Sequence, residues 1–521
     1  MLNYILKSLI IILSLVFLLK IYLKIFKIYQ LNGYQIIKTL NFMVMSKLNI
    51  FSLVMLVIFN LTYIIFYNNN LCLFILALLN IIISIVYIFK TEQNVNNKNN
   101  LVFTKRFSRF FILFLILNLS FLITFSFIIK TNSIYFLYVN FYLISILFFI
   151  ISHFLILPLE ILIKKFYILK AKNKIKKMKN LKVIGITGSF AKTSVKNYVY
   201  ELLKIKYKVC KTQKSYNTEM GFTKVILNDL KEDDEILILE YGADHVHDIE
   251  KLCKIVKPNY SIITGVTNQH LKTFKTLNNI ILTKYELVKN TDKNGFVIFN
   301  GDNKISKDYY DKTNITKYLV GSNSEFDLFS KDVNIDYNGS TFKLSDNKNL
   351  EIEVQTKLLG RHNVINLMLA LCMALKLGVD LKEIISKVKD IKPTEHRLNL
   401  LESAGKYILD DSFNANSIGV YYALEVLKTF KNNKIVITGG IVELGENQYE
   451  ENYKLGKALK EFDVVVITNF INKKALLDGL GDYENKVFVV SNLNEAIKII
   501  EPYFKIGDCV LFLNDLPDNY K

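Results

Sequence analysis

The segment Val183–Ser194 has the residue types and the order of a phosphate-binding loop. Val183–Thr187 is a β-branched run typical of a buried parallel strand, a tight turn Gly188–Ala191 follows, and Lys192 opens a helix. In such a loop the backbone N–H groups and the positive end of the helix hold phosphate oxygens, and the lysine neutralises the outer phosphates. The hydroxyl of Thr193 is suited to Mg²⁺. The pattern therefore predicts a nucleotide-binding loop.

One residue of this loop departs from the common pattern. Ala191 stands where such loops normally carry glycine. If the position needs a positive φ, alanine costs about 1 kcal/mol or more. The alternative interpretation is an ordinary strand-to-helix turn with a lysine nearby.

Polar side chains also follow the next predicted strands. Ile236–Glu240 ends in an acid, Tyr260–Thr264 leads toward His270, and Gly295–Asn300 ends in an amide. Parallel α/β sheets place their sites at the carboxyl ends of strands. These side chains are therefore expected at one edge of a sheet, behind the phosphate loop.

A second group of motifs follows farther along the chain. Gly360–Asn366 opens a helix, and His396–Leu398 and Asp410–Asn416 are rich in polar side chains. Beyond them, short apolar strands alternate with helical segments and predict a separate, smaller doubly wound domain; these strands are Lys434–Thr438, Val464–Thr468 and Val487–Val490.

The order of these motifs resembles the Mur ligase family, the ATP-dependent amide-forming enzymes of peptidoglycan synthesis. The resemblance covers about residues 181–521 and is greatest to the branch that adds D-alanyl-D-alanine (MurF-like). The motifs that carry it are TGSFAKTS, SYNTEMG at 215–221, LEYGADH at 239–245, ITGVTNQHL at 263–271, TKYEL at 283–287, NGD at 300–302, GRHNVIN at 360–366, EHRL at 395–398, DDSFNAN at 410–416 and GGIVELG at 439–445.

The resemblance implies a role for each matching residue. Residues expected to bind ATP are Gly188, Ser189, Ala191, Lys192, Thr193, Ser194, Asn300, Asn363, Arg397 and Asp411. Those expected to hold Mg²⁺ are Thr193, Glu240, His270 and Lys284, the lysine as a carbamate. Lys192, Lys284 and His270 are the expected catalytic residues, and Asn414 and Asn416 are expected to face the incoming amine. For Lys284, the alternative is an ordinary surface lysine on a helix.

The implied reaction joins a carboxylate to an amine. Transfer of the γ-phosphoryl group of ATP gives an acyl phosphate, which the amine of an amino acid or dipeptide attacks. A peptidoglycan-precursor carboxylate is the expected donor. Membrane spans take the place of the family's UDP-sugar-binding domain, so a lipid-linked muropeptide, a γ-glutamyl polymer as in poly-γ-glutamate synthases, and a non-catalytic nucleotide-sensing scaffold are the alternatives.

The first third of the chain is apolar and almost free of acids. Each of its long apolar runs is near the length that crosses a hydrocarbon core, and five spans are predicted, at about Tyr4–Leu19, Ile50–Tyr67, Leu71–Phe89, Phe110–Ile129 and Ile134–Leu157. For the first run a cleaved signal peptide is the alternative. No predicted span carries Asp, Glu, Arg or His near its centre, which favours an anchor over an ion relay.

Basic residues set the expected orientation. Loops 20–49 and 90–109 and the segment after residue 160 are rich in Lys and Arg, whereas the alternate loops together carry one basic residue. The positive-inside rule then predicts a multi-pass protein of the cytoplasmic membrane, with its N-terminus outside and its ligase part in the cytoplasm. These lysines explain much of the net charge of +19, so no nucleic-acid partner is expected.

The predicted organisation has three parts. A helical membrane domain spans residues 1–166, an α/β ATP-binding central domain spans 180–391, and a smaller Rossmann-like domain spans 392–521. No two of the five cysteines form a C-x-x-C pair, which fits a reducing compartment. The sequence gives no indication of oligomeric state.

Overall fold

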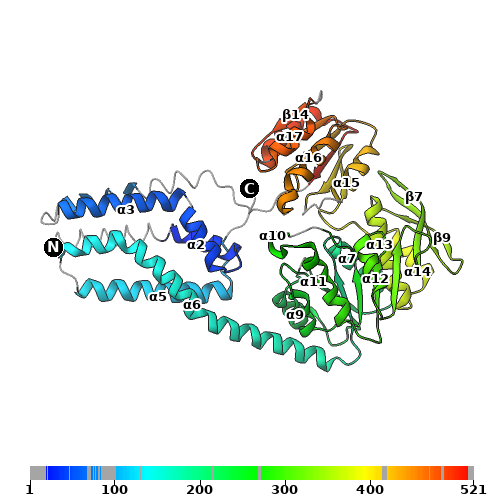
Figure 1. Cartoon of the computed structure of the whole chain (residues 1–521), viewed down its shortest axis with the longest axis horizontal. Helices are drawn as coiled ribbons and strands as arrows, with labels where there is room; N and C mark the ends of the chain where they lie inside the picture. The colour runs from blue at the N-terminus through cyan, green and yellow to red at the C-terminus, as the bar shows by residue number, and fades with distance from the viewer. Residues whose placement is uncertain are drawn as a thin grey trace. The chain divides into compact units, whose positions relative to one another are not determined.

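The computed structural model describes residues 19, 21–45, 47–66, 72–73, 75–76, 78–79, 82–83, 101–128, 131–213, 216–267, 271–413, 419–442, 444–468, 470–482 and 486–513. The chain divides into two compact units, Met1–Phe166 and Tyr167–Lys521 (Figure 1).

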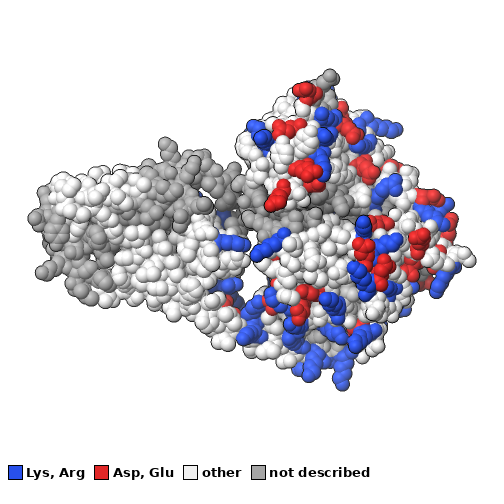
Figure 2. Space-filling view, in the orientation of Figure 1, with Lys and Arg blue, Asp and Glu red and all other residues white. Residues whose placement is uncertain are grey.

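The N-terminal unit is built from helices around an aromatic core. Residues 21–31 are helical, and the longer elements are α2 (Ile36–Met45), α3 (Lys47–Ile65), α5 (Lys105–Ile128) and α6 (Thr131–Lys177). Phe26 packs edge-on against Phe114, with ring centroids 5.3 Å apart, and Tyr29 packs against Phe149 at 5.1 Å. The outer surface carries exposed apolar side chains such as Ile64 at 73%. In Figure 2 the described surface of this unit shows few charged residues.

Two segments of the described chain are long and apolar enough to cross a membrane, Lys105–Thr124 and Leu143–Lys177. The predicted spans at residues 50–67, 110–129 and 134–157 fall on α3, α5 and α6. The predicted spans Tyr4–Leu19 and Leu71–Phe89 lie almost entirely outside the described residues. The five-span membrane domain therefore stays a prediction.

Two features of α6 were not anticipated. The helix continues through Pro158 to Lys177, although proline removes one backbone donor from the helix. His153, near the end of the last predicted span, is buried, and its Nδ1 lies 2.6 Å from the Tyr29 hydroxyl.

The first domain of the second unit contains a nine-stranded sheet in the order β2-β3-β1-β4-β5-β6-β7-β8-β9. The strands from β2 to β7 pair in parallel, and β8 and β9 continue antiparallel. The strands are β1 (Lys182–Thr187), β2 (Val209–Lys211), β3 (Ile236–Glu240), β4 (Tyr260–Ile263), β5 (Phe296–Asn300), β6 (Lys317–Gly321), β7 (Leu328–Asp336), β8 (Gly339–Asp346) and β9 (Glu351–Thr356).

Helices cover both faces of this sheet. One face packs on α7 (Lys192–Leu203), α13 (Arg361–Lys376) and α14 (Leu381–Val388). The other packs on α8 (Glu219–Lys224), its π-helical extension η1 (Val225–Asp229), α9 (Asp248–Ile255), α11 (Leu277–Asn290) and α12 (Lys304–Asp311). The short α10 (Leu271–Phe274) precedes α11. Burial on both faces explains why the central strands, such as ILILE in β3, are apolar throughout.

The second domain of this unit has a six-stranded sheet in the order β10-β11-β15-β12-β13-β14, with β10 antiparallel at the edge. Its strands are β10 (Asn399–Ser403), β11 (Lys406–Asp411), β12 (Lys434–Thr438), β13 (Val464–Ile467), β14 (Lys486–Val489) and β15 (Cys509–Leu513). One face packs on α15 (Gly419–Lys428), α16 (Gln448–Leu459) and α17 (Lys473–Leu480), and the opposite face packs on α18 (Leu493–Ile500). The 3₁₀ turns η2 (Gly445–Asn447) and η3 (Glu501–Tyr503) complete the domain.

Candidate active site

The predicted phosphate loop joins the end of β1 to the start of α7. Gly188 has φ +154°, and a Cβ at this position would lie 2.0 Å from the Thr264 hydroxyl, so a side chain is excluded there. Ala191 caps α7 with φ 60° and ψ 0°, the left-handed conformation that glycine normally supplies. The loop therefore keeps the glycine-type backbone with an alanine, at a cost of about 1 kcal/mol.

Lys192 begins α7 and folds back over the loop. Its Nζ donates to the carbonyl oxygen of Gly188 at 2.8 Å. Burial lowers the pKa of Lys192, and the carboxylate of Glu240 opposes that shift. The N–H groups of the first turn of α7 have no intrahelical acceptor and face the same loop. The Lys192 ammonium and these N–H groups are therefore both placed to bind phosphate oxygens.

Thr193, in the first turn of α7, meets Glu240 at the end of β3. The Thr193 hydroxyl donates to Glu240 Oε2 at 2.9 Å, and the Glu240 side chain is 3% exposed. Two oxygen donors at this position suit a hard divalent cation such as Mg²⁺.

A third member of this group, Lys196, was not predicted from the sequence. Lys196, one turn after Lys192 on α7, places its Nζ 3.3 Å from the same Oε2 of Glu240, and its side chain is 1% exposed. Burial lowers the pKa of Lys196, and the Glu240 carboxylate opposes that shift. The helical spacing was visible in the sequence, but the inward direction of the side chain depends on how α7 packs against β3.

Lys284 lies on α11 and is 3% exposed, so the alternative of an ordinary surface lysine is wrong. Burial and the nearby charge of Lys192 lower the pKa of Lys284 to about 7, against the opposing effect of Asp244 and neighbouring acids. A substantial fraction of the amine, about half at pH 7, is therefore neutral. A neutral amine is the form that reacts with CO₂, which is what a carbamate at this position requires.

Three of the predicted site residues, His270, Asn414 and Asn416, lie outside the described residues. Among the described residues, the Ser189 hydroxyl exchanges hydrogen bonds with the backbone of Thr267, at 3.2 and 3.1 Å. This contact ties the phosphate loop to the segment that leads toward His270.

Two predicted nucleotide-contacting amides are held by the protein itself. Asn300 donates to the carbonyl oxygen of Thr264 at 2.8 Å and accepts from the backbone N–H of Asp302 at 3.0 Å. Asn363 accepts from the Tyr198 hydroxyl at 3.1 Å and donates to the Leu359 carbonyl at 2.9 Å. In the described structure both side chains therefore shape the backbone around the site.

Arg397, before β10, and Asp411, at the end of β11, lie close enough to shift each other's pKa. Burial raises the pKa of Asp411 to about 6, while Arg397 opposes the shift, and Asp411 Oδ1 also accepts from the Leu398 N–H at 3.1 Å. The Arg397 guanidinium lies 4.7 Å from the ring centre of Phe413. Arg397 lies close enough to lower the pKa of Lys192, so it belongs to the same charged site.

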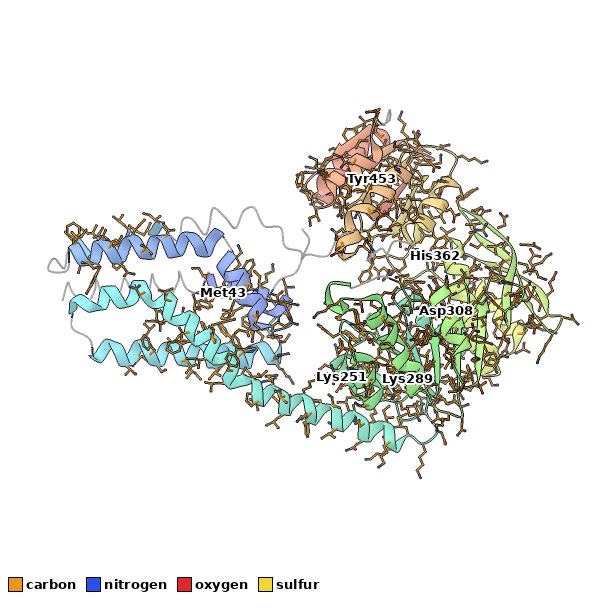
Figure 3. All side chains as sticks on the ribbon, in the orientation of Figure 1. Met43, Lys251, Lys289, Asp308, His362 and Tyr453 are labelled. Carbon is orange, nitrogen blue, oxygen red and sulfur yellow. The ribbon has the colours of Figure 1, made fainter. Side chains whose placement is uncertain are left out.

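His362, at the start of α13, is a second residue that the sequence analysis did not single out (Figure 3). Its ring stacks on Tyr422 with centroids 5.2 Å apart, and its Nδ1 is buried without a hydrogen-bond partner. Burial and Arg397 lower the pKa of His362 to about 4. A neutral ring with an unsatisfied nitrogen beside Arg397 fits a polar ligand such as a nucleotide at this site.

A further group of atoms that could bind a metal ion lies between α9 and α11. His247, Glu250 and Glu286 place one donor atom each within 4.8 Å of one another. Glu286 Oε2 accepts from the backbone N–H of Glu250 at 2.9 Å, so it caps the first turn of α9. Lys251 on α9 and Lys289 on α11 mark these two helices in Figure 3.

Comparisons with known proteins agree with this architecture. The profile of the Mur ligase middle domain matches residues 186–374, and the profile described as Mur ligase, glutamate ligase domain, matches residues 396–514. The UDP-N-acetylmuramoyl-tripeptide–D-alanyl-D-alanine ligase of Buchnera aphidicola subsp. Baizongia pistaciae is 30% identical over 58% of this chain and 69% of its own length. The Bacillus subtilis enzyme of the same name is 25% identical over 58% of this chain and 71% of its own.

A solved structure is similar over the same region. The MurF ligase of Thermotoga maritima, crystallised in complex with ADP, superposes with a TM-score of 0.61 at 27% identity, and covers 68% of this chain and 80% of that one. The phosphate loop, the acid at the end of β3 and the two family matches together lead to one conclusion: the chain belongs to the Mur ligase family of ATP-dependent ligases that form amide bonds.

Proposed function

We propose that this protein joins the dipeptide D-alanyl-D-alanine to the free carboxylate of a muramoyl-tripeptide precursor, at the expense of ATP. The observation that carries the proposal is the placement of Lys192 and Thr193, at the start of α7, beside the phosphate loop and Glu240, in a chain whose relatives carry this activity in their names. About a third of the Buchnera enzyme lies outside the match, so the donor substrate is part of the proposal.

The charged groups of the site have distinct tasks. A carboxylate is a poor acyl donor, so it is first converted to an acyl phosphate, and the amine then displaces phosphate. Lys192 and the loop amides neutralise charge on the transferred phosphoryl group. Arg397 adds positive charge to the same site. Thr193 and Glu240 would hold Mg²⁺, which would neutralise phosphate charge at this site.

Lys284 is proposed to serve a second metal together with His270. As a carbamate it would offer the hard oxygen donors that Mg²⁺ prefers, whereas an ammonium would repel the ion. Its lowered pKa supports this role because the neutral amine is available near pH 7.

We further propose that the N-terminal unit anchors this ligase in the cytoplasmic membrane, with the ligase on the cytoplasmic side. Two apolar helical segments and the many lysines after residue 160 support the anchor. A membrane-resident ligase has direct access to lipid-linked carboxylates. A lipid-linked muropeptide is therefore the second candidate donor, and γ-glutamyl polymers are a third.

The test uses the full chain in detergent or in lipid nanodiscs. ATP and D-alanyl-D-alanine are supplied with either UDP-linked or lipid-linked muramoyl-tripeptide, and phosphate release and product mass are measured. Phosphate release that depends on both the amine and one of these donors is expected, and the preferred donor decides between the candidates. Phosphate release that never depends on donor or amine would reject the proposal, and nucleotide binding without any phosphate release would favour the non-catalytic scaffold.

A further inference from the structure

The imidazole and the two carboxylates between α9 and α11 are spaced like the ligands of a single metal ion. His247 Nδ1 lies 3.1 Å from Glu286 Oε1 and 3.3 Å from Glu250 Oε2, and the three atoms all lie within 4.8 Å of one another. Ligand atoms of a tetrahedral zinc ion lie about 2.0–2.2 Å from the metal and therefore about 3.3–3.5 Å from each other. Two of the three separations are close to that value.

Glu286 is the buried member of this group, with 8% of the residue exposed. Its Oε2 accepts from the backbone N–H of Glu250 at 2.9 Å. Within the described part of the chain, the partner of its Oε1 is the His247 ring alone. A buried carboxylate oxygen is costly unless a cation or a hydrogen-bond donor meets it. The structure thus directs a buried acceptor toward the other two ligand atoms.

The second oxygen of each carboxylate is held by another part of the protein. Glu250 Oε1 lies 2.7 Å from Lys254 Nζ, one turn farther along α9, and Glu286 Oε2 is held by the start of the same helix. Each carboxylate therefore keeps one oxygen for the His247 ring. Hydrogen bonds and ion pairs of this kind orient the ligands of protein metal sites.

The two carboxylates would repel each other without a cation between them. Glu250 Oε2 and Glu286 Oε1 lie within 4.8 Å, where like charges disfavour each other. Lys254 balances one of the two charges, and a proton on His247 or a bound metal ion can balance the other. Protons and metals compete for such ligands, so the same atoms serve either occupant.

His247 stands at a position where the backbone favours glycine. It precedes the first residue of α9 with φ 68° and ψ 9°, and its side chain is 68% exposed. Burial of the ring therefore does not offset the strain. What the ring gains at this position is contact with the two carboxylates.

We propose that His247, Glu250 and Glu286 bind a divalent transition-metal ion, with water completing the coordination. One imidazole and two carboxylates suit zinc best among these ions. The site is separate from the Mg²⁺ site proposed at Thr193 and Glu240, and the inference does not depend on the proposed function.

The ion would clamp α9 to α11, which pack side by side on the same face of the sheet (Figure 1). The chain between His247 and Glu286 includes His270 and Lys284. A metal that closes a long loop restricts the unfolded chain and stabilises the fold. Zinc is therefore expected to stabilise the central domain around the second proposed Mg²⁺ site, without taking part in ligation.

Zinc binding by the full chain in detergent tests the site. The protein is stripped with a chelator, kept in excess Mg²⁺ and ADP so that the nucleotide site is occupied, and titrated with zinc chloride by calorimetry. One equivalent of zinc should bind. The melting temperature should rise with zinc concentration, because an ion that binds only the folded state stabilises it.

His247→Gly removes a ligand and should keep the fold, because glycine adopts φ 68° without strain. Its metal-free melting temperature should equal or exceed that of the wild type, and its rise with zinc should disappear. His247→Gly and Glu250→Gln should each weaken zinc binding about tenfold or more. The matched controls, His245→Ala and Glu325→Gln, change exposed residues outside the group and should keep the wild-type affinity.

Three results would overturn the inference. The wild type could bind no zinc, or His247→Gly and Glu250→Gln could both keep its affinity. Zinc binding that is lost in Lys284→Ala but kept in His247→Gly would place the ion at the second proposed Mg²⁺ site instead. None of these measurements uses ligation, so a failure of the proposed function would be distinguished from a failure of the zinc site.

Discussion

Lys196 and Glu240 form an ion pair inside the protein, with Nζ 3.3 Å from Oε2 and side chains that are 1% and 3% exposed. The Thr193 hydroxyl shares the same carboxylate oxygen. The lysine therefore neutralises the acid that is proposed to hold Mg²⁺, and the site keeps charge balance without the ion.

The first prediction tests this pair. Lys196→Met leaves a buried carboxylate without its counter-charge and should destabilise the ligase by about 3–5 kcal/mol. Thermal unfolding of the full chain measures the loss, and Mg²⁺ with ADP should restore part of it. Lys204→Met, at a side chain that is 42% exposed, is the control. Equal melting temperatures for the two variants would contradict the prediction.

The second prediction concerns the alanine of the phosphate loop. Ala191→Gly should keep or raise ATP turnover, because glycine adopts φ 60° without the strain of a Cβ. Ala191→Val should lower turnover and stability, since a β-branched side chain is least tolerated in this conformation. Phosphate release and melting temperature are measured for both. A large loss of activity in the glycine variant would show that the loop works differently.

The third prediction removes the lysine that folds over the loop. Lys192→Ala should abolish ATP turnover, because charge on the transferred phosphoryl group is no longer neutralised. Folding should persist, as judged by an unchanged elution volume and melting transition. Lys204→Ala, on the exposed side of the end of α7, should behave as the wild type. Unchanged phosphate release in Lys192→Ala would remove the role assigned to this residue.

The fourth prediction concerns Lys284, whose pKa is lowered to about 7. The neutral fraction rises as the pH passes 7, so incubation with ¹³C-labelled bicarbonate at pH 8 should give a carbamate signal in the ¹³C spectrum. Lys284→Ala should abolish that signal and lower turnover strongly, and a short carboxylic acid should restore part of the turnover. The same treatment should not rescue His270→Ala.

Lys289 provides the control for this experiment, because it lies on the same helix and is exposed. Lys289→Ala should keep both the signal and the turnover. Wild-type turnover in Lys284→Ala would mean that other residues build the second metal site.

The fifth prediction concerns orientation. A reporter that is active only in the cytoplasm, fused after Lys521, should be active, because the basic segments retain the ligase on that side. An externally active reporter at the same position should remain silent. The reverse pattern would overturn the proposed topology.

The sequence predicted correctly those strands whose apolar residues form a continuous run and are buried in the structure. The strands β1, β3, β4 and β5 lie within a residue of their predicted ranges, because each is a short apolar run buried on both faces. The antiparallel β8 and β9 were not predicted. Charged side chains separate their few apolar residues, Lys343 in β8 and the exposed Glu351 and Glu353 in β9, so the pairing of β8 with β7 and of β9 with β8 defines them.

The candidate site likewise contains residues that the sequence predicted and residues that it did not. Lys192, Thr193 and Glu240 were found because loop and strand-end motifs fix their positions along the chain. Lys196 and the unpaired His362 nitrogen were missed, because their importance arises from packing across α7 and α13. The sequence predicted a cost for Ala191 only if this position needs a positive φ, and the structure shows a φ of 60° there.

Asp410 and Asp411 are adjacent in the chain, yet their side chains lie on opposite sides of β11. A deletion or insertion of one residue in the β10–β11 hairpin would exchange the two environments. The length of the hairpin is therefore fixed by the need to keep these two acids in different surroundings.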